Sequence, residues 1–193
     1  MSVAIARQVG LEYICLKSMH LPLESTPEQI KAAVAKIKQA GTIPYGCGVV
    51  NMTKEAQVQQ AFEYAKAAGM NVIVAMPLPE MLPLVDKLVQ KYDVRVAIHN
   101  HGPEDKVWPT PEVIMQKIDK LDRRVGLCID IGHTVRAGVN LLTTTEKYAE
   151  RLFDLHMKDV DSATAKAHTV VVGIRERQRP EILPQQAFVS SGR

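Results

Sequence analysis

The stretches VRVAIHNHG (94–102), VGLCIDIGH (125–133) and LFDLHMKD (152–159) decide the fold of this chain. Each is an apolar, strand-like run that ends in polar side chains, and four of the chain's six histidines lie at or just past such an end. If the three strands are parallel neighbours, their carboxyl ends face one mouth and the polar groups converge there. The pattern predicts a metal-dependent site on an α/β barrel.

The bulk composition limits the class of protein. The chain has 193 residues, 46% of them hydrophobic, which suits one domain with a sizeable core. The net charge of +3 and the pI near 8.7 arise from Lys and Arg dispersed among Asp and Glu, so nucleic-acid binding is not expected. No apolar run approaches the ~20 residues that span a bilayer, and no signal peptide is recognisable. Three cysteines without CxxC spacing fit a reducing compartment, and we expect a cytoplasmic protein.

Strand and helix patterns alternate along the chain, which predicts βα units and a parallel sheet. Strands are expected at residues 11–16, 45–50, 71–75, 94–98, 125–130 and 152–157, and the helices between them include 27–40, 54–68, 110–121 and 143–151. A complete (β/α)8 barrel takes ~250 residues. We therefore predict an α/β fold of the (β/α)8 TIM-barrel type over residues 1–173, incomplete, with about six βα units.

Both ends of the chain depart from a whole barrel. Residues 1–10 resemble the tail of an earlier helix, and residues 174–193 lose all periodicity. We expect a barrel truncated at both ends and an irregular or aberrant tail over 174–193, and we hypothesise that the reading frame is lost near residue 174. An inactive barrel fragment is one alternative, and its two unpaired sheet edges would favour a homo-oligomer.

The first stretch places two histidines on one face of its strand. His99 and His101 share a face because side chains alternate along a strand. They are two metal ligands, or one metal ligand and one proton carrier. Trp108, the only tryptophan, lies in the loop EDKVWPTP that follows. It is expected to form a wall of the substrate pocket or to cover the barrel rim.

The other two stretches supply a carboxylate, two imidazoles and an amine. Asp130 ends an apolar strand, where a carboxylate needs a partner such as a metal ion. His133 follows a glycine and is expected to contact substrate or support a ligand. His156 can ligate a divalent metal, and Lys158 on the same strand face can bind a phosphate or stabilise an oxyanion.

Three motifs carry a resemblance to a known family. IHNHGP (98–103), GLCIDIGH (126–133) with RAG at 136–138, and LHMKDVD (155–161) resemble the sugar phosphate isomerase/epimerase family, which has the xylose isomerase-like TIM barrel. The resemblance implies a divalent metal, Mn, Mg, Co or Zn, held by a Glu, an Asp, a His and a second Glu from four successive barrel strands. Asp130 matches the Asp, and His156 matches the His.

Two positions of the family pattern differ in this chain. His99 stands where many members have the first Glu, and the second Glu has no counterpart. His133 matches a histidine that typically contacts substrate. The expected metal ligands are therefore His99, Asp130 and His156. We expect His101 to carry the proton and Lys158 to stabilise the reacting oxygen, with His133, Lys158 and Trp108 contacting substrate.

The expected activity is isomerisation or epimerisation of a sugar, ketose or sugar phosphate. The metal would polarise a carbonyl and its neighbouring hydroxyl, a base would take the α-proton, and the metal and Lys158 would stabilise an enediolate. A dehydratase or lyase of the inosose dehydratase type is the enzyme alternative, because it begins with the same proton abstraction. Neither reading implies a membrane or a nucleic acid as a partner.

Overall fold

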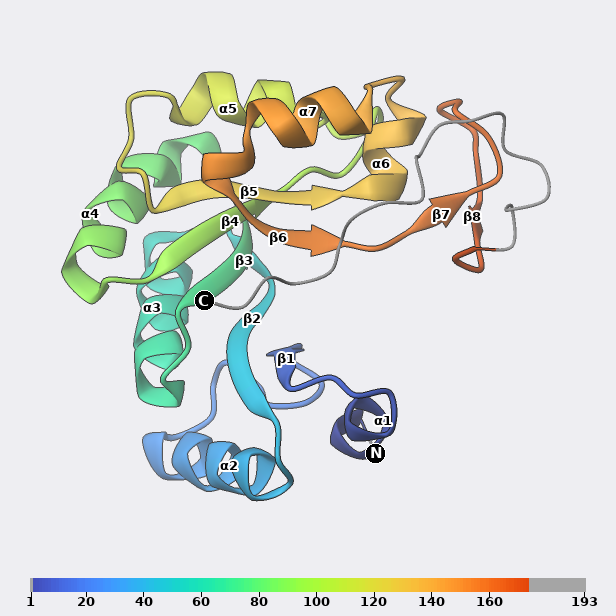
Figure 1. Ribbon diagram of the computed structural model, residues 1–193. Helices are drawn as coiled ribbons and strands as arrows, with labels where there is room; N and C mark the ends of the chain where they lie inside the picture. The colour runs from blue at the N-terminus through green and yellow to red at the C-terminus, as the bar shows by residue number, and fades with distance from the viewer. Residues whose placement is uncertain (1, 174–193) are drawn as a thin grey trace.

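The computed structural model describes residues 2–173, and its centre is a curved sheet of six parallel strands (Figure 1). The order of the strands in the sheet follows their order in the chain, as in a barrel wound in one direction. The six strands form a half-barrel, a partial TIM barrel. They are β1 (Tyr13–Leu16), β2 (Ile43–Met52), β3 (Val72–Pro77), β4 (Arg95–His99), β5 (Val125–Asp130) and β6 (Leu152–His156).

Helices connect the strands and cover one face of the sheet (Figure 1). A short antiparallel pair, β7 (Asp159–Val160) with β8 (Thr169–Val170), follows β6. The helices are α1 (Ser2–Gln8), α2 (Pro27–Gln39), α3 (Glu55–Ala68), α4 (Leu82–Tyr92), α5 (Pro111–Ile118), α6 (Ile131–Arg136) and α7 (Leu141–Lys147), with 3-10 turns at Pro79–Met81 and Ala149–Arg151.

The helices begin where the sequence offers a cap. Thr26 caps α2, since its hydroxyl accepts a hydrogen bond from the backbone N–H of Gln29 and the Gln29 side chain bonds back to the Thr26 backbone. Thr110 caps α5 in the same way through the N–H of Val113. Both helices start with a proline, whose missing N–H costs nothing at that position.

The two faces of the sheet bury different side chains. Alternate residues of the strands, such as Ile73, Ile98 and Leu127, pack with the helices in the main hydrophobic core. The opposite, inner face of the half-barrel carries a smaller cluster of Val72, Val74, Ala97 and Cys128. His99 and Asp130, the last residues of β4 and β5, share this inner face with Ala97 and Cys128. They therefore lie at the mouth of the half-barrel.

The predicted architecture is confirmed, with corrections to its details. The six parallel strands are present, but β1 begins at Tyr13 and β2 extends over Ile43–Met52. The expected helix over 143–151 is instead α7, ending at Lys147, and a 3-10 turn. The helix α6 and the pair β7–β8 were not anticipated, because each is too short to show a hydrophobic period.

Other predictions concern the ends of the chain and its surroundings. The expected irregular tail at 174–193 and the hypothesis of a lost reading frame lie outside the described residues, and the boundary at residue 173 stays a prediction. Within residues 2–173, none of the helices has the length and apolar character that crossing a bilayer would require.

Candidate metal centre

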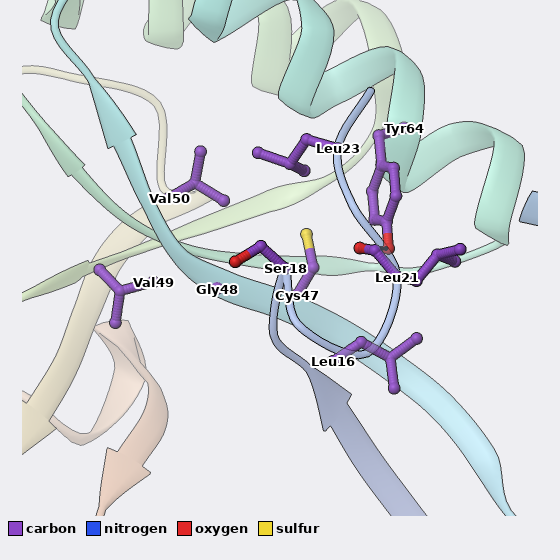
Figure 2. Close-up of a pocket in the computed structure, with 9 residues that line it drawn as sticks. All are labelled: Leu16, Ser18, Leu21, Leu23, Cys47, Gly48, Val49, Val50 and Tyr64. Carbon is purple, nitrogen blue, oxygen red and sulfur yellow. Dashed lines mark hydrogen bonds between the residues drawn. The ribbon is translucent and has the colours of Figure 1, made fainter. Parts of the chain in front are cut away.

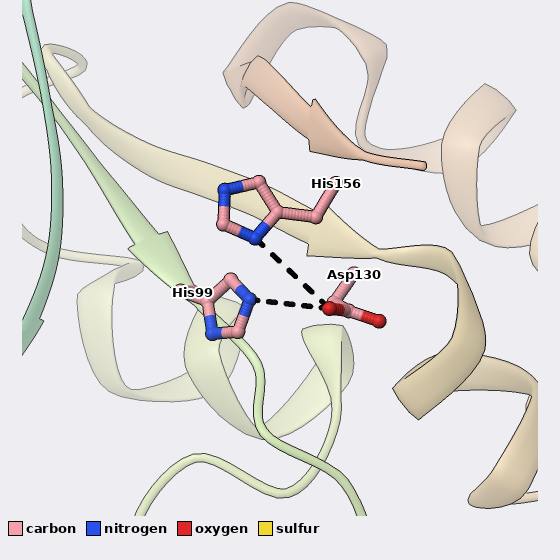
Figure 3. Close-up of side chains that lie close together, drawn as sticks. All are labelled: His99, Asp130 and His156. Atoms are coloured by element: carbon pink, nitrogen blue, oxygen red, sulfur yellow. Dashed lines mark ion pairs between the residues drawn. The ribbon is translucent and has the colours of Figure 1, made fainter. Parts of the chain in front are cut away.

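Three side chains meet at the carboxyl ends of β4, β5 and β6 (Figure 3). His99, Asp130 and His156 each offer one ligand atom, and these atoms all lie within 4.8 Å of one another. The strand register explains the convergence: His99 lies opposite Cys128, and Asp130 lies directly opposite His156. The predicted convergence of these three residues at one rim is what the structure shows.

Asp130 is the centre of this cluster. Its side chain is buried, with Oδ2 lying 2.8 Å from Lys158 Nζ, 3.4 Å from His99 Nε2 and 4.0 Å from His156 Nδ1. Its Oδ1 accepts a hydrogen bond of 2.9 Å from the backbone N–H of His133, so Asp130 also caps α6. Burial raises the pKa of Asp130, but the His99 ring, the Lys158 ammonium and the His133 N–H outweigh burial and hold that pKa well below its usual range. The carboxylate is therefore ionised.

His99 is the strongest sign that the cluster binds a cation. Only 4% of the residue is exposed, and neither Nδ1 nor Nε2 has a hydrogen-bond partner in the described part of the chain. The 3.4 Å between Nε2 and the Asp130 oxygen is longer than a normal N–H···O hydrogen bond. A buried imidazole without a hydrogen-bond partner is costly, and a bound metal ion would coordinate one of its nitrogens. One carboxylate and two imidazoles form a donor set that fits a divalent ion such as Zn.

His156 is the third potential ligand. Its ring centroid lies 4.5 Å from that of His99, and 32% of its side chain is exposed. Burial and the neighbouring His99 lower the pKa of His156. The imidazole is therefore neutral near pH 7, which is the form that ligates a metal.

Asn100 supports Asp130 from behind. Its buried side chain accepts a 2.9 Å hydrogen bond from the backbone N–H of Asp130 and donates one of 3.2 Å to Thr134. The Thr134 hydroxyl in turn donates to the Asp130 carbonyl at 2.8 Å. Sequence reasoning gave Asn100 and Thr134 no role. The sequence offered one signal, an amide directly after the apolar strand at the position that alternates with His99 and His101, and the structure shows that this amide is fully buried.

His133 and Lys158 extend the site on one side of Asp130. Lys158 Nζ lies 3.0 Å from His133 Nε2, so the ammonium bridges the carboxylate and the imidazole. Burial lowers the pKa of His133 to about 4, with Lys158 adding to that effect and Asp130 opposing it. His133 is therefore neutral at physiological pH. Contact of either residue with substrate stays a prediction.

Arg136 is a third residue to which sequence reasoning gave no role. Its guanidinium lies 3.2 Å from His133 Nδ1, donates to the carbonyl of Ala165 at 2.6 Å and forms an ion pair with Glu104. It therefore joins α6 to the loop after β4 and to the loop between β7 and β8. Arg136 belongs to the RAG segment at 136–138, which is recognisable from the sequence as part of a motif. The contacts that Arg136 makes could not be inferred from that motif.

His101 and Trp108 occupy different environments. The His101 side chain is half exposed, its Nδ1 lies 3.6 Å from the Asp105 carboxylate, and its ring centroid is 5.1 Å from that of His133. It lies beside the cluster, where its predicted proton-carrying role stays open to test. Trp108 is 1% exposed, and its indole N–H donates to the Pro77 carbonyl at 2.7 Å. This burial favours the alternative that Trp108 covers the rim, while its contact with substrate stays a prediction.

A separate cavity lies away from the metal ligands (Figure 2). It measures about 20 Å³, room for roughly one water molecule and far too little for a sugar. Its lining is mostly apolar: Leu16, Ser18, Leu21, Leu23, Cys47, Gly48, Val49, Val50 and Tyr64. This cavity is therefore not a substrate site.

Solved structures with this fold include several relatives of low sequence identity. A xylose isomerase domain protein from Planctomyces limnophilus is 16% identical with a TM-score of 0.68, the match covering 89% of this chain and 74% of that one. The IOLI protein with a bound zinc atom is 18% identical with a TM-score of 0.67, covering 83% and 67%. The 3-keto-D-glucoside 4-epimerase YcjR from E. coli is 14% identical with a TM-score of 0.68, covering 81% and 72%. Such identities establish a shared fold and nothing finer.

The sequence itself gives the family. A comparison with curated proteins finds no match. Residues 3–180 match the family described as xylose isomerase-like TIM barrel, which is most of the chain. With a half-barrel fold and a cluster of potential metal ligands at its carboxyl mouth, the chain belongs to the xylose isomerase-like TIM barrel family.

Proposed function

We propose that this protein is a divalent-metal-dependent isomerase or epimerase acting on a sugar, ketose or sugar phosphate. The observation that carries the proposal is the convergence of His99, Asp130 and His156, in which the buried His99 ring has no hydrogen-bond partner in the described chain. The IOLI neighbour contains zinc and the YcjR neighbour is a sugar epimerase, which supports both the cofactor and the substrate class. Mn, Mg, Co and Zn are all candidates for the metal.

The residues around the cluster divide the chemistry between them. When bound at His99, Asp130 and His156, a divalent ion would polarise the substrate carbonyl and acidify the proton on the adjacent carbon. His101, half exposed beside the cluster, takes that proton at Nε2, since its Nδ1 faces Asp105. The Lys158 ammonium stabilises the negative charge that develops on the substrate oxygen.

The fate of the proton decides the product. Its return to the neighbouring carbon moves the carbonyl and gives an isomer, whereas its return to the opposite face of the same carbon gives an epimer. We assign His133, which is neutral and lies beside Lys158 and Arg136, to contact with the substrate next to the reacting carbon. Trp108 is assigned to the wall or the rim of the same mouth.

Further features of the proposal concern the setting of the enzyme. The three cysteines are all free, which fits the reducing cytoplasm. We also propose a homo-oligomer, because β1 and β6 are the two edges of the sheet in the described chain.

Exchange of substrate protons with solvent tests the proposal. Protein loaded with Mn, Co or Zn is incubated in D2O with a panel of keto-sugars, sugar phosphates and inososes, and NMR follows deuterium at the carbon next to the carbonyl. We expect deuterium uptake with an isomeric product, lowered by about 10²–10⁴-fold in His101→Ala. The matched control is His168→Ala, which removes an exposed histidine from the loop between β7 and β8.

The other outcomes assign the alternatives. Deuterium uptake with loss of water identifies a dehydratase. No uptake on any substrate together with no metal retained identifies an inactive barrel fragment and contradicts the proposal.

A further inference from the structure

One carboxylate oxygen, Asp130 Oδ2, lies near several side-chain nitrogen atoms at once. Asp130 Oδ2 is the carboxylate atom that both His99 and His156 approach, and the same atom lies 2.8 Å from Lys158 Nζ. The other oxygen, Oδ1, is committed to the backbone N–H of His133. A divalent ion held by the two imidazoles and Oδ2 would therefore meet the Lys158 ammonium at its own carboxylate ligand.

The fold holds the Lys158 side chain in this position. A Cβ at Gly132 would lie 2.7 Å from Lys158 Cδ and 2.8 Å from its Cγ, so only glycine leaves room for the lysine stem. The side chain of Lys158 is 28% exposed, less than that of a free surface lysine. Because Gly132 has no side chain, the Lys158 stem packs against the start of α6. This packing places the ammonium beside Asp130 Oδ2.

We propose that Lys158 is an internal counter-cation of the site, which competes with the divalent metal for Asp130 Oδ2. A carboxylate with 1% exposure requires a compensating charge, and Lys158 is the cation that supplies it among the described residues. Two cations at one carboxylate repel each other strongly in a buried site. Metal binding therefore displaces the ammonium from Oδ2 toward its second partner, His133 Nε2, which lies 3.0 Å away.

Two consequences follow for the proposed enzyme, on whose metal centre this inference rests. Lys158 weakens metal binding relative to the three ligands alone, while pairing with the Asp130 carboxylate when no metal is bound. The displaced ammonium then lies beside His133, at the side of the site assigned to substrate. Lys158 thus sets the metal affinity of the site as well as contacting the substrate oxygen.

Titration of the chelator-stripped protein with Co²⁺ alone, followed by calorimetry, measures the competition. We expect Lys158→Met to bind Co²⁺ at least tenfold more tightly than the wild type, because the competing charge is gone. Lys158→Arg keeps a cation and is expected to stay within about threefold of the wild type. Lys38→Met is the matched control, since it removes one exposed positive charge from α2 and is expected to leave the affinity unchanged.

Thermal unfolding supplies a second readout that does not depend on affinity. Stripped Lys158→Met is expected to melt below the wild type because Asp130 has lost its counter-charge, and saturating Co²⁺ is expected to close the gap. Lys158→Gln repeats both measurements with a polar side chain if the methionine variant fails to fold.

The results separate this inference from the proposed function. Equal or weaker Co²⁺ binding by Lys158→Met overturns the competition, and the metal centre stands as long as His99→Leu abolishes binding. Failure of both the wild type and Lys158→Met to bind Co²⁺ overturns the metal centre and the competition together. Binding by Lys158→Met alone supports both.

Discussion

Replacement of His99 by leucine is predicted to change stability in opposite directions without and with metal. Leucine has a similar volume and no polar atoms, so it removes two buried ring nitrogens that have no hydrogen-bond partner in the described chain. Each buried unsatisfied group costs about 1–3 kcal/mol, partly offset here by the attraction between Nε2 and Asp130. Without metal, we therefore expect His99→Leu to be about 1 kcal/mol more stable than the wild type.

The size of the metal effect follows from linkage. A ligand at 100 times its dissociation constant stabilises the folded state by about 2.7 kcal/mol. For a chain of 193 residues the entropy of unfolding is about 0.4 kcal/mol/K. The wild type should therefore melt about 7 °C higher with saturating Zn²⁺, and His99→Leu should show no shift.

Scanning calorimetry of stripped and Zn²⁺-loaded samples of both proteins decides the matter. His168→Leu serves as the matched control, because it removes an exposed histidine outside the cluster and should keep the full Zn²⁺ shift. A stripped His99→Leu protein that melts well below the wild type would show that the imidazole is already satisfied. A Zn²⁺ shift retained in that variant would place the metal elsewhere.

Three further substitutions test the packing around the site. Tyr45→Phe removes the 3.0 Å hydrogen bond from the Tyr45 hydroxyl to Asp154, and urea unfolding should show a loss of about 1 kcal/mol. Trp108→Phe leaves the Pro77 carbonyl without its indole donor and should cost about 2–3 kcal/mol in the same assay. If Trp108 only covers the rim, Trp108→Phe will leave the KM of the proposed reaction unchanged, whereas a wall of the substrate pocket requires that KM to rise. Burial raises the pKa of Cys47 from 9.0 to about 12, so the stability this thiol contributes is complete below pH 9 and lost as pH rises toward 12. The unfolding free energy of Cys47→Ala should therefore fall less steeply with pH above 9 than that of the wild type.

Periodicity alone determined the order of elements. Apolar runs such as VGLCID (125–130) are bounded by turns and alternate with capped helices, and these features are local in the sequence. Strand β5 was predicted at Val125–Asp130 and is found there. The alternation of six strands with helices predicted βα units and a parallel sheet. The barrel winding was the expectation drawn from the ligand-bearing strand ends and from the resemblance of the three motifs to the xylose isomerase-like family.

The positions of Asp130, His99 and His156 were also predictable, because all three residues end neighbouring parallel strands. The contacts around them were not. The hydrogen bonds of Asn100 to Asp130 and Thr134, and the contacts of Arg136 with Glu104 and Ala165 in two separate loops, join residues roughly thirty positions apart. Sequence spacing carries no signal for such pairs.

The tertiary structure alone decided which cation pairs with the buried Asp130 carboxylate. Sequence reasoning placed Lys158 near the substrate, since it shares a strand face with His156. Only the close approach of α6 to the chain after β6, which Gly132 permits, sets the ammonium on Asp130 Oδ2. A local pattern fixes the face on which a side chain lies, whereas the packing of distant segments fixes the partner that it finds there.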